Sequence, residues 1–158
     1  MRSAPKGSLR VDRVLLDTST FFDVGKAPRQ AKALWAQNTI YHLVQYQLHH
    51  SKLTISAFTA FEYLNGLHRQ SRLPEAEEFL STVLPSLDVI YPDSAIYALA
   101  SKIHAALALA GMTIGVPDTF IAATAVNQNL TLVTANTKHF QRVGDVGFPL
   151  WLDNWRDA

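Results

Sequence analysis

The chain has 158 residues, of which 48% are hydrophobic, and this length suits one domain with a sizeable core rather than two. It has no cysteine, which excludes disulfides, thiolate catalysis and cysteine-ligated zinc and fits a reducing, cytoplasmic environment. A net charge of +1 gives no overall attraction to nucleic acid, and no apolar run is long enough to span a membrane.

Strand-like and helix-like segments alternate along the chain. Residues 1–11 predict a flexible leader without the apolar centre of a secretory signal, and residues 12–155 predict a single domain. Short apolar runs predict strands at residues 11–16, 53–56, 87–91, 130–134 and 148–152. Apolar residues at helical spacing predict helices at residues 28–50, 57–69, 74–84, 94–110, 117–128 and 136–140.

This alternation predicts an α/β fold, in which helices cover both faces of a mostly parallel sheet of four or five strands. In such sheets, ligands bind beyond the carboxyl ends of the strands. Asp17 ends the first predicted strand, Glu62 lies in the helix after the second, and Asn136 follows the fourth. Asp118 begins a predicted helix, where the chain also approaches this edge. The sequence therefore predicts that these four residues converge on one crevice.

Asp17, Glu62 and Asp118 each stand at the edge of an apolar segment. A carboxylate in such surroundings is costly unless it is paired, hydrogen-bonded or bound to a metal. Three such carboxylates indicate an oxygen-ligand site for a hard divalent cation. The alternatives are that Asp17 and Asp118 are helix N-caps and that Glu62 lies on a solvated helix face. Asp93 also follows a proline, and we assign it to capping because no other acidic residue accompanies it.

The segment Thr134-Ala135-Asn136-Thr137-Lys138-His139 is the last candidate group. Asn136 can ligate a metal, hold a metal-bound water or cap the short helix that follows. His139 can act as a general acid, contact a phosphate or serve only the structure. The residues alone leave these alternatives open.

Together these segments resemble the PIN domain, and within it the VapC-type ribonuclease toxins of type II toxin–antitoxin systems. The resemblance covers about residues 12–155 in the family's order and spacing, although each motif is weak alone. The matching segments are Leu15-Leu16-Asp17-Thr18-Ser19, Ile55-Ser56-Ala57 with the following Glu62 and Gly66-Leu67, residues 115–125, residues 132–140 and residues 152–155.

The resemblance implies a PIN-like three-layer α/β/α sandwich and a metal-dependent endoribonuclease that hydrolyses RNA phosphodiester bonds. Asp17, Asp118 and Glu62 would hold Mg²⁺ or Mn²⁺, and Glu62 would either ligate through water or orient the nucleophile. Asn136 and Thr134 would hold the water or the scissile phosphate. The implied partners are a structured RNA such as a tRNA, a cognate antitoxin protein and a second copy of the chain in a homodimer, with no membrane.

The sequence departs from the family pattern at two places. The family often has Asn where Ser19 stands, and we expect the hydroxyl of Ser19 or Thr18 to orient Asp17 instead. Many members carry a fourth acidic residue in the last motif, where this chain has Asn136 and His139. We therefore expect one bound ion rather than two in the free protein.

Two other functions stay open at this point. One is a PIN-like module that has lost activity and only binds RNA or regulates a partner, because fold does not imply function. The other is a phosphatase of the haloacid-dehalogenase type, which also has an aspartate after its first strand. That family needs a second aspartate two residues later, and Ser19 stands there instead, so this alternative is disfavoured.

Overall fold

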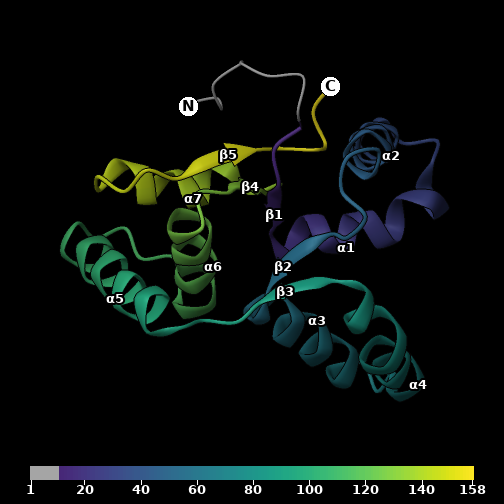
Figure 1. The fold of residues 1–158 in the computed structure, drawn as a ribbon, viewed down its shortest axis with the longest axis horizontal. Helices are drawn as coiled ribbons and strands as arrows, with labels where there is room; N and C mark the ends of the chain where they lie inside the picture. The colour runs from purple at the N-terminus through teal and green to yellow at the C-terminus, as the bar shows by residue number, and fades with distance from the viewer. Residues whose placement is uncertain (1–10) are drawn as a thin grey trace.

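A five-stranded sheet lies at the centre of the computed structural model, which describes residues 11–158 (Figure 1). The order of strands in space is β3-β2-β1-β4-β5, and every neighbouring pair is parallel. The predicted leader therefore lies outside the described residues, except for Val11. The strands are β1 (Val14–Leu16), β2 (Thr54–Ser56), β3 (Asp88–Ile90), β4 (Thr131–Val133) and β5 (Trp151–Asp153).

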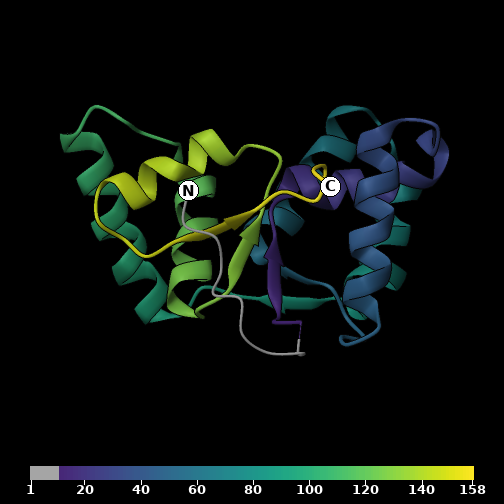
Figure 2. The same ribbon diagram turned by 90° about the horizontal axis from the view of Figure 1, so that it is seen from above.

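Helices cover both faces of this sheet, which confirms the predicted three-layer α/β/α arrangement. Figures 1 and 2 show one group of helices on each side of the strands. The first group comprises α1 (Thr18–Lys26), α2 (Leu34–Gln47), α3 (Ala57–Arg69) and α4 (Leu73–Glu78). The second group comprises α5 (Ser94–Leu109), α6 (Val116–Asn127) and α7 (Thr137–Asp145).

The alternation of side chains along the central strands divides the core into two parts. Leu15 in β1 and Leu132 in β4 pack in the cluster under α5, α6 and α7. Their neighbours Leu16 and Val133 point to the other face and pack with α1, α2 and α3. All four side chains are fully buried, as a parallel sheet with two covered faces requires.

Several predicted boundaries are wrong for identifiable reasons. Residues 28–50 do not form one helix: a 3₁₀ turn at Ala27–Gln30 follows α1, and α2 begins only at Leu34. Pro28 suits the short 3₁₀ turn, and the extended backbone of Ala33 separates that turn from α2.

Two other predicted helices also differ in length. The helix predicted at residues 74–84 ends as α4 at Glu78, and a π-helical turn and a 3₁₀ turn continue the chain to Ser86. Helix α7 is longer than the predicted 136–140 and reaches Asp145. Within residues 11–158, none of the helices is both long and apolar enough to cross a bilayer.

Candidate active site

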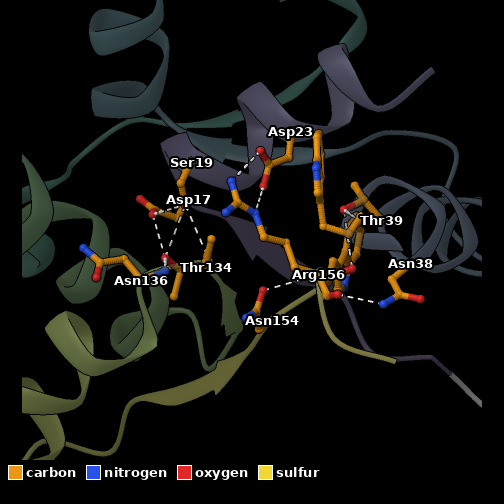
Figure 3. Close-up of polar contacts among 12 residues, drawn as sticks. Asp17, Ser19, Asp23, Asn38, Thr39, Thr134, Asn136, Asn154 and Arg156 are labelled. Carbon is orange, nitrogen blue, oxygen red and sulfur yellow. Dashed lines mark hydrogen bonds and ion pairs between the residues drawn. The ribbon is translucent and has the colours of Figure 1, made fainter. Parts of the chain in front are cut away.

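Asp17 occupies the position immediately after β1, and its side chain is almost completely buried. Its backbone N–H donates to the carbonyl of Val133 at 2.9 Å, which continues the pairing of β1 with β4. Its carboxylate oxygen Oδ2 accepts hydrogen bonds from Thr134 Oγ1 at 2.8 Å and Ser19 Oγ at 3.0 Å (Figure 3). Asp17 is the N-cap residue of α1, yet its side chain makes no capping hydrogen bond. The carboxylate is therefore oriented toward the sheet edge rather than used as a cap.

The sheet topology explains why Asp17 and Thr134 meet. From β1 the chain builds the sheet toward β2 and β3, and it later returns to place β4 on the other side of β1. Ligand crevices in open α/β sheets form where the strand order reverses in this way. The hydroxyl of Ser19 also accepts a hydrogen bond from the backbone N–H of Ala135 at 3.2 Å, and the hydroxyl of Thr134 accepts one from the backbone N–H of Asn136 at 3.0 Å. The bond from Ala135 to Ser19 joins the two segments that follow β1 and β4, and the bond from Asn136 to Thr134 stabilises the turn after β4.

Glu62 reaches the same edge from α3, whose first turn is capped by the side chain of Ser56. The carboxylate oxygen Oε1 of Glu62 accepts a hydrogen bond of 2.7 Å from the hydroxyl of Thr18. Glu62 is half-buried and faces α1, which rules out the solvated outer face considered from the sequence. Of the two hydroxyls expected to orient Asp17, Ser19 does so and Thr18 serves Glu62 instead.

Asp118 lies in the first turn of α6, and its carboxylate is not a cap either. The N-cap residue is Gly115, whose φ of +86° is a conformation that glycine adopts without strain. Asp118 Oδ2 lies 2.8 Å from Nε2 of His139, which α7 contributes. By contrast, Asp93 does cap α5 by accepting the backbone N–H of Ile96 at 2.9 Å, as predicted.

The three carboxylates influence one another electrostatically. Burial raises the pKa of Glu62, the hydrogen bond from Thr18 opposes this, and the charges of Asp118 and Asp17 raise the pKa further. Burial also raises the pKa of Asp118, where the hydrogen bond from His139 acts in the opposite direction and the charge of Asp17 adds to the rise. The charges of Asp17 and Asp118 therefore act on Glu62, and the charge of Asp17 acts on Asp118, which agrees with the predicted convergence of these residues on one edge.

No lysine or arginine within residues 11–158 forms an ion pair with any of these three carboxylates. In the same part of the chain, no three His, Cys, Asp or Glu side chains are gathered tightly enough to enclose an ion directly. The chemistry of the donors nevertheless suits Mg²⁺, which usually takes one or two protein carboxylates and keeps several waters. The feature that fits such an ion is a set of carboxylates without a lysine or arginine partner, of which Asp17 and Glu62 are held by hydroxyl donors and Asp118 by the imidazole of His139.

Asn136 stands next to Thr134 in Figure 3 and is exposed. It is the N-cap residue of α7, but its side chain makes no capping hydrogen bond. Its amide is therefore not committed to the helix, and its place beside Thr134 agrees with the convergence predicted from the sequence.

Sequence reasoning missed two partners in this group. Thr134 was expected to hold water or phosphate, whereas its buried hydroxyl donates to Asp17. His139 was not expected to pair with Asp118. The sequence did offer a signal for the contact between Thr134 and Asp17, because two apolar strands that pair in parallel both end in polar residues. No local signal indicated the contact between His139 and Asp118.

The PIN domain family model matches residues 14–146, which is most of the chain. This chain belongs to the PIN domain family. Among its relatives, Ribonuclease VapC1 of Methanocaldococcus jannaschii is 29% identical over 139 residues, covering 88% of this chain and 87% of the relative. The tRNA(fMet)-specific endonuclease VapC of Shigella flexneri is 32% identical, covering 68% of this chain and 81% of the relative.

Among solved structures of this family, VapBC-1 from nontypeable Haemophilus influenzae is similar in fold. A chain of that structure superposes with a TM-score of 0.71 at 25% sequence identity, covering 91% of this chain and 98% of the other. The similarity therefore extends over nearly the whole PIN domain and supports the three-layer architecture described above.

Proposed function

We propose that this chain is a metal-dependent endoribonuclease that acts as the toxin of a type II toxin–antitoxin pair. The observation that carries the proposal is the arrangement of Asp17, Glu62 and Asp118, each held by a hydrogen bond from another segment and none in an ion pair with lysine or arginine within residues 11–158. Membership of the PIN domain family and the VapC names of the relatives support RNA as the substrate.

Asp17 and Asp118 would hold the divalent ion directly and Glu62 would hold it through a water, and we propose Mg²⁺ or Mn²⁺ as the ion. Such an ion supplies Lewis acidity to a phosphodiester and lowers the pKa of a bound water. The residues of the chain do the positioning. Asp17 is fixed at one oxygen by Ser19 and Thr134, and its Oδ1 makes no hydrogen bond within residues 11–158.

Glu62 is the residue of this group that we assign to the proton of the attacking water. Burial and the charges of Asp118 and Asp17 raise its pKa, so this carboxylate takes up a proton more readily than a free glutamate. The hydroxyl of Thr18 fixes one of its oxygens at 2.7 Å. We assign the exposed amide of Asn136 to the scissile phosphate or its water, since this side chain is free of a capping role.

The partners follow from the same comparison. We propose a structured RNA, such as a tRNA, as the substrate, because one relative is named a tRNA(fMet)-specific endonuclease. A cognate antitoxin is proposed because VapBC structures are similar in fold. A homodimer is proposed only from the family resemblance.

Cleavage of total tRNA and ribosomal RNA by the purified chain tests this function. We expect cleavage in Mg²⁺ or Mn²⁺, none in EDTA, and none by an Asp118→Asn variant purified in the same way. Asp93→Asn is the matched control, because Asp93 also follows a proline at a helix start but caps the helix. Equal cleavage by wild type and Asp118→Asn, or absence of cleavage in every metal, would contradict the proposal.

A further inference from the structure

Helix α7 holds the loop between α5 and α6 through two side chains that lie one turn apart. Nε2 of His139 lies 2.8 Å from Asp118 Oδ2 and 3.2 Å from the carbonyl oxygen of Ile114. Arg142 donates through Nη1 to the carbonyl of Thr113 at 3.0 Å. Both contacts fall on the segment that leads into α6, but only the His139 contact reaches a carboxylate of the proposed site.

The two neighbours of His139 Nε2 define its role in hydrogen bonding. A carboxylate oxygen and a backbone carbonyl oxygen can only accept, so Nε2 must carry a hydrogen in either charge state of the ring. The imidazole therefore donates toward Asp118 whether it is neutral or protonated. This contact does not depend on a proton moving between the two side chains.

The imidazole of His139 is held in place by packing against the core. The next residue, Phe140, is almost completely buried in the core, and its ring meets the ring of His139 edge to face at 5.5 Å. The side chains of His139 and Asp118 are themselves only 24% and 29% exposed. A donor anchored to the core in this way can fix the direction of a carboxylate that stands on the first turn of another helix.

We infer that His139 is a positioning residue for Asp118: its Nε2–H fixes Oδ2 and leaves Oδ1 for the metal ion. This inference rests on the proposed function and adds a role for a residue that sequence reasoning left between catalysis and structure. Asp118 Oδ1 makes no hydrogen bond within residues 11–158. Its position thus parallels that of Asp17, whose Oδ2 is fixed by Ser19 and Thr134.

Three variants of His139 separate positioning from packing. His139→Gln keeps an N–H donor at about the place of Nε2, whereas His139→Leu and His139→Asn do not offer a donor there. Arg142→Met is the matched control, because it removes the other contact of α7 with the same loop but touches no carboxylate. His139→Asn keeps the site polar, so the test survives if the leucine variant does not fold.

The measurements are Mn²⁺ affinity by titration calorimetry without RNA, and kcat and KM for RNA cleavage. We expect His139→Leu and His139→Asn to bind Mn²⁺ about 10–100-fold more weakly than wild type, as is typical when a residue that orients a metal ligand is lost. Their kcat should fall at saturating RNA. His139→Gln and Arg142→Met should stay within about threefold of wild type in both measurements.

Three outcomes would overturn the inference alone, while wild type still binds Mn²⁺ and cleaves RNA. The first is unchanged Mn²⁺ affinity in His139→Leu or His139→Asn. The second is a His139→Gln variant as weak as His139→Asn, and the third is an equal loss in Arg142→Met, which would assign the effect to the loop. If wild type itself binds no Mn²⁺, the proposed function and this inference fail together.

Discussion

Two buried carboxylates, one just before α1 and one within it, have opposite surroundings in the fold (Figure 3). Asp23, near the end of the helix, accepts two hydrogen bonds from the guanidinium of Arg156, at 2.6 and 2.9 Å. The carboxylate of Asp17, immediately before the first residue of the helix, accepts hydrogen bonds within residues 11–158 only from the hydroxyls of Ser19 and Thr134. One carboxylate is neutralised by a cation of the protein, and the other is oriented by neutral donors.

The difference separates a carboxylate that is paired with a cation of the protein from one that, under the proposed function, binds a metal ion. The hydrogen bonds that Arg156 donates to Asp23 raise the pKa of the guanidinium, so Arg156 stays charged at any ordinary pH. It also fastens the C-terminal segment to α1, and the carbonyl of Arg156 accepts a hydrogen bond from Asn38 of α2. Asp17 forms no ion pair within residues 11–158, and under the proposed function a metal ion would supply the missing positive charge.

The largest expected difference between the two carboxylates is in RNA cleavage when each is replaced by an amide. Asp17→Asn keeps an oxygen that accepts from Ser19 and Thr134, so the fold should survive. Cleavage of RNA should fall at least about 100-fold, because loss of a ligand costs more than loss of a residue that merely orients one. Asp23→Asn, assayed well below its unfolding temperature, should cleave RNA nearly as wild type does. The rates are compared in Mn²⁺ with the same RNA.

The hydroxyl that orients Asp17 should matter next. Thr134→Val keeps the shape of the buried side chain but removes its hydrogen bond to Asp17. Affinity for Mn²⁺ should fall about 10–100-fold, and the free energy of unfolding by roughly 1–3 kcal/mol, the usual result when a buried acceptor loses its donor. Ser19→Ala should have a smaller effect, since Thr134 still donates. Unchanged Mn²⁺ affinity in Thr134→Val would argue against the hydroxyl as an orienting donor.

Removal of the cation beside Asp23 should affect stability and leave the chemistry intact. Arg156→Met leaves a buried carboxylate without its partner, although Arg156 itself is 45% exposed. We expect the free energy of unfolding to fall by about 1–3 kcal/mol, less than for a fully buried pair because solvent screens the exposed end. Urea unfolding measures this change. A double-mutant cycle measures the coupling between the two residues: in the Asp23→Asn background, Arg156→Met should lower the free energy of unfolding by less.

The pH dependence of stability should show the smallest effect. In an unfolded chain Glu62 titrates near 4.5 and Asp118 near 3.8, and the pKa of each is higher in the metal-free fold. The fold therefore binds more protons than the unfolded chain as pH rises above these values, and the free energy of unfolding falls through that window. Glu62→Gln should weaken this dependence. Urea unfolding in EDTA across this pH range measures how the free energy of unfolding changes with pH. An identical change in wild type and Glu62→Gln would show that Glu62 is not involved.

The sequence predicted the position of the site better than its internal contacts. Helix α3 has the predicted bounds Ala57–Arg69, Asp17 stands where β1 ends, and the charges of Asp17 and Asp118 act on Glu62. These inferences depend on local patterns and on a general rule of α/β sheets. The prediction of one long helix at residues 28–50 was wrong, because nothing in the sequence around Ala33 signals the extended backbone found there.

The contacts that orient each carboxylate were beyond sequence reasoning because they join distant segments. Thr134 follows Asp17 by 117 positions, and Arg156 follows Asp23 by 133. Asp17 and Asp93 both precede a helix and look alike in sequence, but only the side chain of Asp93 makes a capping hydrogen bond. Tertiary packing therefore decides whether an acidic residue is paired with a cation of the protein, caps a helix or is held by hydroxyl donors alone.

Thermal unfolding in Mn²⁺ and in EDTA tests the central claim most directly, namely that the fold gives Asp23 a cation and leaves Asp17 to bind one from solution. An ion that binds only the folded state should stabilise wild type by about 2.7 kcal/mol when present at about 100 times its dissociation constant. Asp23→Asn should begin from a lower melting temperature and rise by the same free energy, whereas Asp17→Asn should not rise. Equal stabilisation of all three proteins, or none of wild type, would contradict the account.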